Sequence, residues 1–177
     1  MQNQQPYITS SDGNRKFSCF PAAVLAIIVN QKEEVLLMQP PRENEGWQVV
    51  NGAMEMGETP LEAAIRETSE EVGSQIQVRP LGTVHVSSFH YDENVKNMLS
   101  IAHLFAYEEG QIIPGDDMAG SEFHWFGMDE IAAENFDLII PPGEKWLIAR
   151  AIDLYRLWGK ENPTNQNGFN LSIRGKK

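Results

Sequence analysis

The apolar residues follow strand-type patterns in some stretches of the chain and helix-type patterns in others, and these patterns predict its secondary structure. Residues 22–29, AAVLAIIV, form an unbroken apolar run rich in Val and Ile, which is typical of a buried strand. A polar turn at 31–34 and the apolar residues 35–38 predict its hairpin partner. Further β-type stretches lie at 47–50, 75–91, 98–107 and 122–126. Within the longest of them, Pro80 and Gly82 predict a bend or bulge.

Helical patterns occupy three other stretches, at 60–72, 128–136 and 143–158. Apolar residues of the last stretch lie on more than one face of the predicted helix. We therefore expect it to pack deeply or to contact a second subunit, which allows a homodimer without requiring one. Strands mixed with three helices predict an α/β (α+β) sandwich.

Residues 59–73 carry start and stop signals for the first helix. Thr59 is the expected N-cap, Pro60 suits the first helical position, and Glu62 completes a capping box. Gly73 favours a left-handed C-terminal stop. At about 100° per residue, one face of this helix is expected to pack on the core. That face carries Leu61, Ile65, Thr68 and Val72.

A second face of this helix gathers three carboxylates, Glu67, Glu70 and Glu71, because spacings of three and four bring side chains together. Each like-charge pair costs about 0.2–0.5 kcal/mol. Glu70 and Glu71 also lie in the last turn, where the helix dipole favours cations. A solvated acidic face is the commoner explanation for such a pattern. Here, however, the first turn obeys every local rule and the last turn does not, which suggests function.

A divalent cation would relieve this repulsion. Carboxylate ligands favour a hard cation, Mg²⁺ with Mn²⁺ as the alternative, over zinc. Because Mg²⁺ completes its coordination with substrate phosphates, the acidic face predicts phosphate-ester or pyrophosphate chemistry.

Composition limits the expected number of domains, the partners and the compartment of the protein. The chain has 177 residues, 41% of them hydrophobic, which suits one globular domain. Its net charge of −11 argues against a nucleic-acid partner. The longest apolar run is too short to span a membrane, and the polar N-terminus shows no signal-peptide pattern. Cys19 is the only cysteine, which fits a reducing compartment, so we expect a cytoplasmic protein without a membrane partner.

Residues 52–74 resemble the Nudix box, G-x5-E-x7-R-E-U-x-E-E-x-G-U, of the MutT-like Nudix hydrolases. Every charged and glycine position is filled. The departures are Thr68 and Ser74 at aliphatic positions and Val50-Asn51-Gly52 in place of the usual P-G-G. A Trp before the box, the later EFHWFGMDEI stretch and a C-terminal helix extend the resemblance over residues 20–158.

The resemblance implies a Nudix-type α/β/α sandwich with a mixed central sheet and a loop–helix–loop metal site. It implies a Nudix domain at 20–158, an N-terminal extension at 1–19 and a flexible C-terminal tail at 159–177. It also implies Mg²⁺-dependent hydrolysis of a pyrophosphate bond in a nucleoside diphosphate linked to another moiety. The substrate would be a nucleoside triphosphate, a nucleotide sugar such as ADP-ribose, or a dinucleoside polyphosphate. The alternative is a non-catalytic nucleotide-binding regulatory module, which would usually have lost box glutamates.

The resemblance also implies roles for individual residues. Glu67, Glu70 and Glu71 would bind one to three Mg²⁺ ions, and the backbone carbonyl of Asn51 would add a ligand. A positive φ at that last position would suit Gly better than Asn. Glu58 and Arg66 would brace the loop–helix–loop, with a surface ion pair as the alternative.

The general base and the substrate contacts stay open. A box glutamate or a late-loop glutamate is the candidate base; among the late acidic residues Glu122 leads, ahead of Asp116, Asp117 and Glu109. A solvated loop charge explains each of the late residues equally well. Trp47 is a candidate for stacking on a nucleobase and Tyr91 for substrate contact, although packing explains both. The four histidines, at 85, 90, 103 and 124, are expected to be hydrogen-bonded structural residues.

Overall fold

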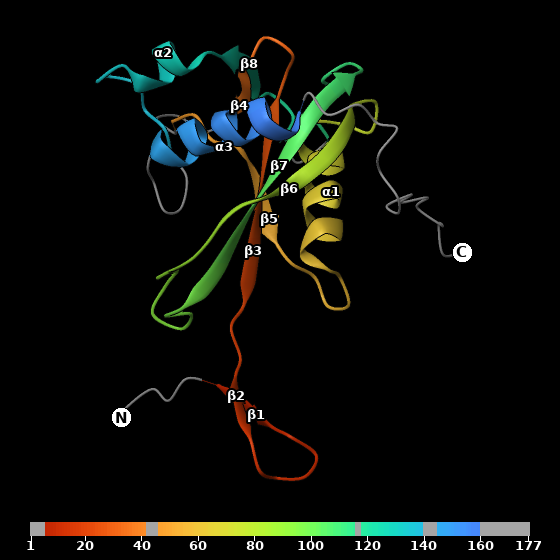
Figure 1. Ribbon diagram of the computed structural model, residues 1–177, viewed down its shortest axis with the longest axis vertical. Helices are drawn as coiled ribbons and strands as arrows, with labels where there is room; N and C mark the ends of the chain where they lie inside the picture. The colour runs from red at the N-terminus through yellow and green to blue at the C-terminus, as the bar shows by residue number, and fades with distance from the viewer. Residues whose placement is uncertain (1–5, 42–45, 116–117, 140–144, 160–177) are drawn as a thin grey trace.

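The protein is described by a computed structural model over residues 6–41, 46–115, 118–139 and 145–159 (Figure 1). Its centre is a mixed sheet in the order β6-β7-β3-β4-β8, with β5 paired to β3 off this path. The strands are β3 (Ala22–Val29), β4 (Val35–Gln39), β5 (Val50–Ala53), β6 (Gln77–Phe89), β7 (Met98–Glu109) and β8 (Glu122–Phe126). The helices are α1 (Pro60–Glu71), α2 (Met128–Ala132) and α3 (Lys145–Trp158). The predicted sandwich with a mixed central sheet is confirmed.

Strand β3 organises this sheet. It pairs antiparallel with β4 and β5 and parallel with β7, in register from Ala22 with Leu99 to Val29 with Ala106. Residues 24–29 are all buried. A strand covered on both faces needs an unbroken apolar sequence, which explains the run at 22–29.

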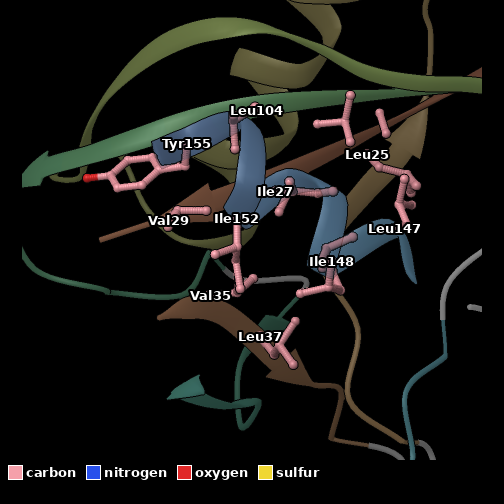
Figure 2. Close-up of a cluster of buried hydrophobic side chains, with 14 of the residues drawn as sticks. Leu25, Ile27, Val29, Val35, Leu37, Leu104, Leu147, Ile148, Ile152 and Tyr155 are labelled. Carbon is pink, nitrogen blue, oxygen red and sulfur yellow. The ribbon is translucent and has the colours of Figure 1, made fainter. Parts of the chain in front are cut away.

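The sheet separates two apolar cores. Alternate residues of β3, including Leu25 and Ile27, pack with Leu147 and Ile148 of α3 (Figure 2). The other residues of β3 face α1 and form a second core with Val50, Ala63, Ala64, Val72 and Phe105. Helices α1 and α3 therefore cover opposite faces of the sheet, as Figure 1 shows.

Helix α1 has the boundaries that its sequence predicts. The Thr59 side chain accepts from the backbone N–H of Glu62, whose carboxylate accepts in return from the backbone N–H of Thr59 at 2.8 Å. Gly73 follows the C-cap with φ of +105°. Thr68 is buried on the predicted core face, and its hydroxyl donates to the Ala64 carbonyl at 2.7 Å. That bond satisfies the polar atom which replaces the family's aliphatic side chain.

Some local expectations differ from the structure. The strand expected at 47–50 begins instead at Val50 and runs into the box, because its partner is β3; residues 47 and 48 form isolated bridges. Helix α2 ends at Ala132, since the next residue has ψ of 142°. The bulge near Pro80 and Gly82 is confirmed by a register shift between them.

Residues before the sheet form a two-stranded hairpin, β1 (Tyr7–Thr9) with β2 (Lys16–Ser18), which differs from the sequence-based expectation of an N-terminal extension without strands. It stands apart from the sheet in Figure 1. The tail expected at 159–177 lies outside the described residues beyond Gly159. Within the part of the chain that the structure describes, no helix has the length and apolar character needed to cross a membrane.

Candidate active site

Strand β5 brings the start of the box against the middle of α1. A Cβ atom built on Gly52 would lie 2.0 Å from both Cδ and Oε1 of Glu67. A side chain at position 52 would therefore force this carboxylate to leave its place beside the strand. The side chain of Glu67 is 12% exposed, so the strand and the helix together hold it in a half-enclosed position.

Arg66 connects three carboxylates of the box. Its Nε and Nη2 atoms donate to the two oxygens of Glu58 at 2.7 and 3.1 Å, which is a bidentate pair. Its Nη1 atom donates to Glu67 at 2.8 Å and to Glu70 at 2.9 Å. Nη2 also donates to the Ala53 carbonyl at 3.0 Å. One guanidinium thus connects the loop before α1 to two successive turns of the helix, and the bracing role of Arg66 and Glu58 stays a prediction.

The carboxylates differ in their electrostatic environment. Hydrogen bonds from Arg66 and from the Glu55 backbone lower the pKa of Glu58. Burial raises the pKa of Glu67, although Arg66 acts in the opposite direction. Burial also raises the pKa of Glu71, to about 8, and the charges of Glu67 and Glu70 add to that effect. A backbone N–H from Asn51 partly offsets it. The raised pKa values of Glu67 and Glu71 show that their charged forms are disfavoured here, and a bound cation would favour those charged forms.

Side-chain chemistry at this site suits a hard divalent cation. Glu67, Glu70 and Glu71 offer only oxygen atoms, which Mg²⁺ and Mn²⁺ prefer. In the described ranges these carboxylates do not form a ready-made group of three ligands. Instead, Arg66 Nη1 lies between Glu67 and Glu70, where a positive charge is needed. Since the Glu70 side chain is 58% exposed, it has room to turn from Arg66 toward a metal ion.

Asn51 is placed differently from its expected role. It lies within β5, opposite Leu25, and its backbone N–H donates to Oε2 of Glu71 at 3.2 Å. Glu33 is the only described non-glycine residue with positive φ, so the conformational reason for preferring Gly at position 51 does not apply here. The metal-ligand role of its carbonyl stays a prediction.

The other predicted site residues are distributed over the fold. Glu122 is exposed at the start of β8, opposite Gln39 of β4, and Glu109 is exposed at the end of β7. Asp116 and Asp117 lie outside the described residues. The Trp47 ring packs edge-on against Phe126, with ring centroids 4.7 Å apart, beside the α3 core. Tyr91 is 64% exposed in the β6–β7 connection. The structure therefore brings together the box residues, but not Trp47 or Tyr91 with them.

Sequence reasoning missed the backbone that contacts the end of α1. The N–H groups of Ile113 and Gly115 donate to the carbonyls of Val72 and Glu70, at 2.9 and 3.2 Å. These carbonyls belong to the last turn, where no intrahelical partner exists. Glycines at both ends of the segment 110–115 were the available signal, because close backbone contact often requires Gly.

Comparison with known proteins agrees with this geometry. The NUDIX domain family matches residues 20–147. The chain is 30% identical over 135 residues to an NAD-capped RNA hydrolase, NudC, of Vibrio cholerae, covering 75% of this chain and 44% of that protein. It is 46% identical over 61 residues to the mouse 8-oxo-dGDP phosphatase NUDT18, covering 33% of this chain and 18% of that protein. The chain thus spans less than half the length of these curated relatives.

Solved structures share the fold. The crystal structure of an ADP-ribose pyrophosphatase from Streptococcus suis superposes with a TM-score of 0.61 at 16% identity, covering 78% of this chain and 93% of that one. At this identity the likeness concerns the fold alone. The family match covers most of the chain and includes the whole α1 segment with Glu67, Glu70 and Glu71. This chain therefore belongs to the Nudix hydrolase family.

Proposed function

We propose that the protein is a divalent-metal-dependent pyrophosphohydrolase that acts on nucleotides. The observation that carries this proposal is the charge arrangement on α1. A half-buried Glu67, an exposed Glu70 and a Glu71 with raised pKa share one helix, and Arg66 pairs with the first two. A helix end built this way costs stability unless a bound cation offsets the repulsion.

Each residue of the box has a distinct task in this proposal. Glu67, Glu70 and Glu71 supply the oxygen ligands, and Arg66 with Glu58 keeps Glu67 at a fixed distance from β5. When bound, Mg²⁺ neutralises phosphate charge and lowers the pKa of an attacking water. The water oxygen adds to one phosphorus, the bond from that phosphorus to the bridging oxygen breaks, and the second phosphate leaves with the bridging oxygen. A carboxylate accepts the proton from the water, and Glu122 and the box glutamates remain the candidates.

The proposed substrates share a nucleoside diphosphate unit. The relatives and the fold neighbour carry names that refer to an NAD cap, 8-oxo-dGDP and ADP-ribose, and each of these contains a pyrophosphate bond. We therefore place nucleotide sugars, dinucleotides and nucleoside di- and triphosphates in the proposed substrate class. Mg²⁺ is the proposed metal, with Mn²⁺ as the alternative, and the cytoplasm remains the proposed compartment.

A nucleotide panel tests this function. Release of nucleoside monophosphate or phosphate is measured from ADP-ribose, NADH, diadenosine polyphosphates and nucleoside di- and triphosphates, with Mg²⁺ and with EDTA. We expect turnover of at least one compound that EDTA abolishes, and a loss of orders of magnitude in Glu70→Gln without loss of folding. Metal-dependent binding of these nucleotides without any turnover would instead support the non-catalytic regulatory module. Equal turnover in wild type and Glu70→Gln would contradict the role of that carboxylate.

A further inference from the structure

We propose that residues 110–115, between β7 and β8, are a positioning segment that fixes the metal-binding end of α1, with Gly115 as its key residue. This inference rests on the proposed function, because it concerns the same carboxylates. It differs in assigning a task to residues outside the box. These residues act through the helix backbone and do not touch metal or substrate.

The segment donates hydrogen bonds to the end of α1. The last carbonyls of a helix lack intrahelical donors, and unmet buried carbonyls cost free energy. The N–H groups of Ile113 and Gly115 meet two of them, at Val72 and Glu70. The two donors lie two residues apart in the segment, and their acceptors lie two residues apart at the helix end. Two backbone hydrogen bonds therefore hold the turn that carries Glu70 and Glu71.

The backbone of this segment also lies very close to the backbone at the end of α1 and just after it. A Cβ atom on Gly115 would lie 2.2 Å from the Glu70 carbonyl oxygen, and one on Gly73 would lie 2.2 Å from that of Ile113. A Cβ on Gly110 would lie 2.0 Å from the carbonyl oxygen of Gln75. Glycines on both sides thus allow backbone to meet backbone at three points. A side chain at Gly115 would therefore force the last turn of α1 and this segment apart.

The segment also affects the electrostatics at the end of α1. The described last turn of α1 contains no basic residue, although the dipole and two glutamates make it negative. The N–H dipoles of residues 113 and 115 point at this negative end and partly compensate it. They do so without placing a cationic side chain where it would compete with a metal ion for the carboxylates. Together with the ion pair between Arg66 and Glu70, these N–H groups stabilise the end of α1 before any metal binds.

Two substitutions separate this role from general loop stability. Gly115→Ala introduces the overlap with the Glu70 carbonyl at a residue whose φ is not positive, so it adds no left-handed strain. Gly120→Ala is the matched control in the same connection: its φ is +89°, so alanine is strained there, but the nearest atom to its Cβ is Pro41 Cβ at 3.4 Å. Loop strain alone would affect both variants, whereas pressure on α1 affects only Gly115→Ala.

A second pair tests the hydrogen bond itself. Ile113→Pro removes the N–H that reaches Val72, and Ile113→Ala keeps that N–H while it shortens the side chain. If either Gly115→Ala or Ile113→Pro fails to fold, the other still tests the inference.

The measurement is Mn²⁺ binding to the nucleotide-free protein, followed by the loss of the free Mn²⁺ signal in electron paramagnetic resonance. We expect Gly115→Ala and Ile113→Pro to bind Mn²⁺ about tenfold or more weakly, the size seen when residues that support metal ligands are changed. Gly120→Ala and Ile113→Ala should bind as wild type does. Hydrogen exchange of the metal-free protein should show faster exchange in the last turn of α1 for the first two variants only.

Wild-type affinity in folded Gly115→Ala or Ile113→Pro would overturn the inference and leave the proposed function intact. Mn²⁺ binding that is weakened equally in the controls Gly120→Ala and Ile113→Ala would overturn the inference as well. If the wild type itself binds no Mn²⁺ and hydrolyses no nucleotide, the proposed function fails. In that case, unchanged hydrogen exchange at the end of α1 in Gly115→Ala would overturn the positioning role separately.

Discussion

The carboxylate of Glu67 lies directly over the Cα atom of Gly52, so closely that a Cβ there would be 2.0 Å from Cδ of the glutamate. Because φ of Gly52 is not in the positive region, alanine adds no left-handed strain there, and the three atoms nearest to its Cβ all belong to the Glu67 carboxylate. We predict that Gly52→Ala displaces Glu67 and lowers Mg²⁺-dependent turnover by about tenfold or more. Steady-state kinetics at varied Mg²⁺ measures this effect.

Gly127→Ala is the control for that substitution. Its φ is −75°, and the nearest atom to a built Cβ is a Glu130 oxygen at 3.7 Å, an ordinary contact. It should leave turnover unchanged. If Gly52→Ala were as active as Gly127→Ala, the proposed placement of Glu67 for catalysis would be wrong.

Replacing the central guanidinium gives a second prediction. A lysine in place of Arg66 cannot form the bidentate pair with Glu58 and also reach Glu67 and Glu70. We expect Arg66→Lys to reduce turnover about tenfold or more, because Glu67 loses its support. The matched change Arg156→Lys affects an exposed arginine paired with Glu33 and Asp153, and should alter activity little. Similar kinetics in the two variants would contradict the bracing role.

The capping box of α1 gives a stability prediction. Thr59→Ala removes the side-chain acceptor for the Glu62 N–H, and such changes cost about 1 kcal/mol of stability. For a chain of this size we expect the Tm to fall by about 2–4 °C. Thr59→Ser keeps the hydroxyl and should restore most of the loss. Thermal unfolding followed by circular dichroism compares the three proteins; an unchanged Tm in Thr59→Ala would show that the cap contributes nothing.

His103 gives a prediction for the pH dependence of stability. It is 8% exposed on β7, and its Nε2 atom has no hydrogen-bond partner in the described structure, which differs at this atom from the expected hydrogen-bonded histidine. Burial lowers its pKa below the ordinary 6.5. Below about pH 6.5 the unfolded chain therefore binds a proton that the folded chain does not, and the free energy of unfolding falls as the pH falls.

A comparison with His103→Leu isolates this contribution, since other groups also titrate. Urea unfolding at several pH values should show the wild type losing stability relative to the variant below about pH 6.5. Above that pH the difference between the two proteins should be constant. A difference that stays constant down to pH 5 would contradict the lowered pKa.

The sequence predicted the elements that carry strong local signals. Strand 22–29 was found because both of its faces are buried, and α1 because its cap, its proline and its terminal glycine agree. The hairpin β1–β2 was missed because its strands are three residues long. Its Asp12-Gly13 turn was the remaining signal, since Asp12 accepts from the Asn14 N–H and Gly13 has φ of +74°.

Long-range placement could not be obtained in the same way. The spacing of Glu67, Glu70 and Glu71 indicated a shared function, but no local pattern shows that Arg66 connects Glu58, Glu67 and Glu70 at once. Nor does the sequence show that residues 110–115 meet the end of α1, because that contact depends on where β7 ends in the sheet. The spacing of side chains along the sequence indicated the chemistry of the site. Backbone contacts between distant segments could be found only in the folded structure.

The parallel pairing of β3 with β7 has a consequence for synthesis on the ribosome. Between these neighbours in the sheet, the chain must first produce β4, β5, α1 and β6. Pairings so remote in sequence form slowly, because a long loop must close before they stabilise anything. Both cores lack their β7 side chains until that strand has been synthesised, so the core beneath α1 cannot be completed before Phe105 is in place.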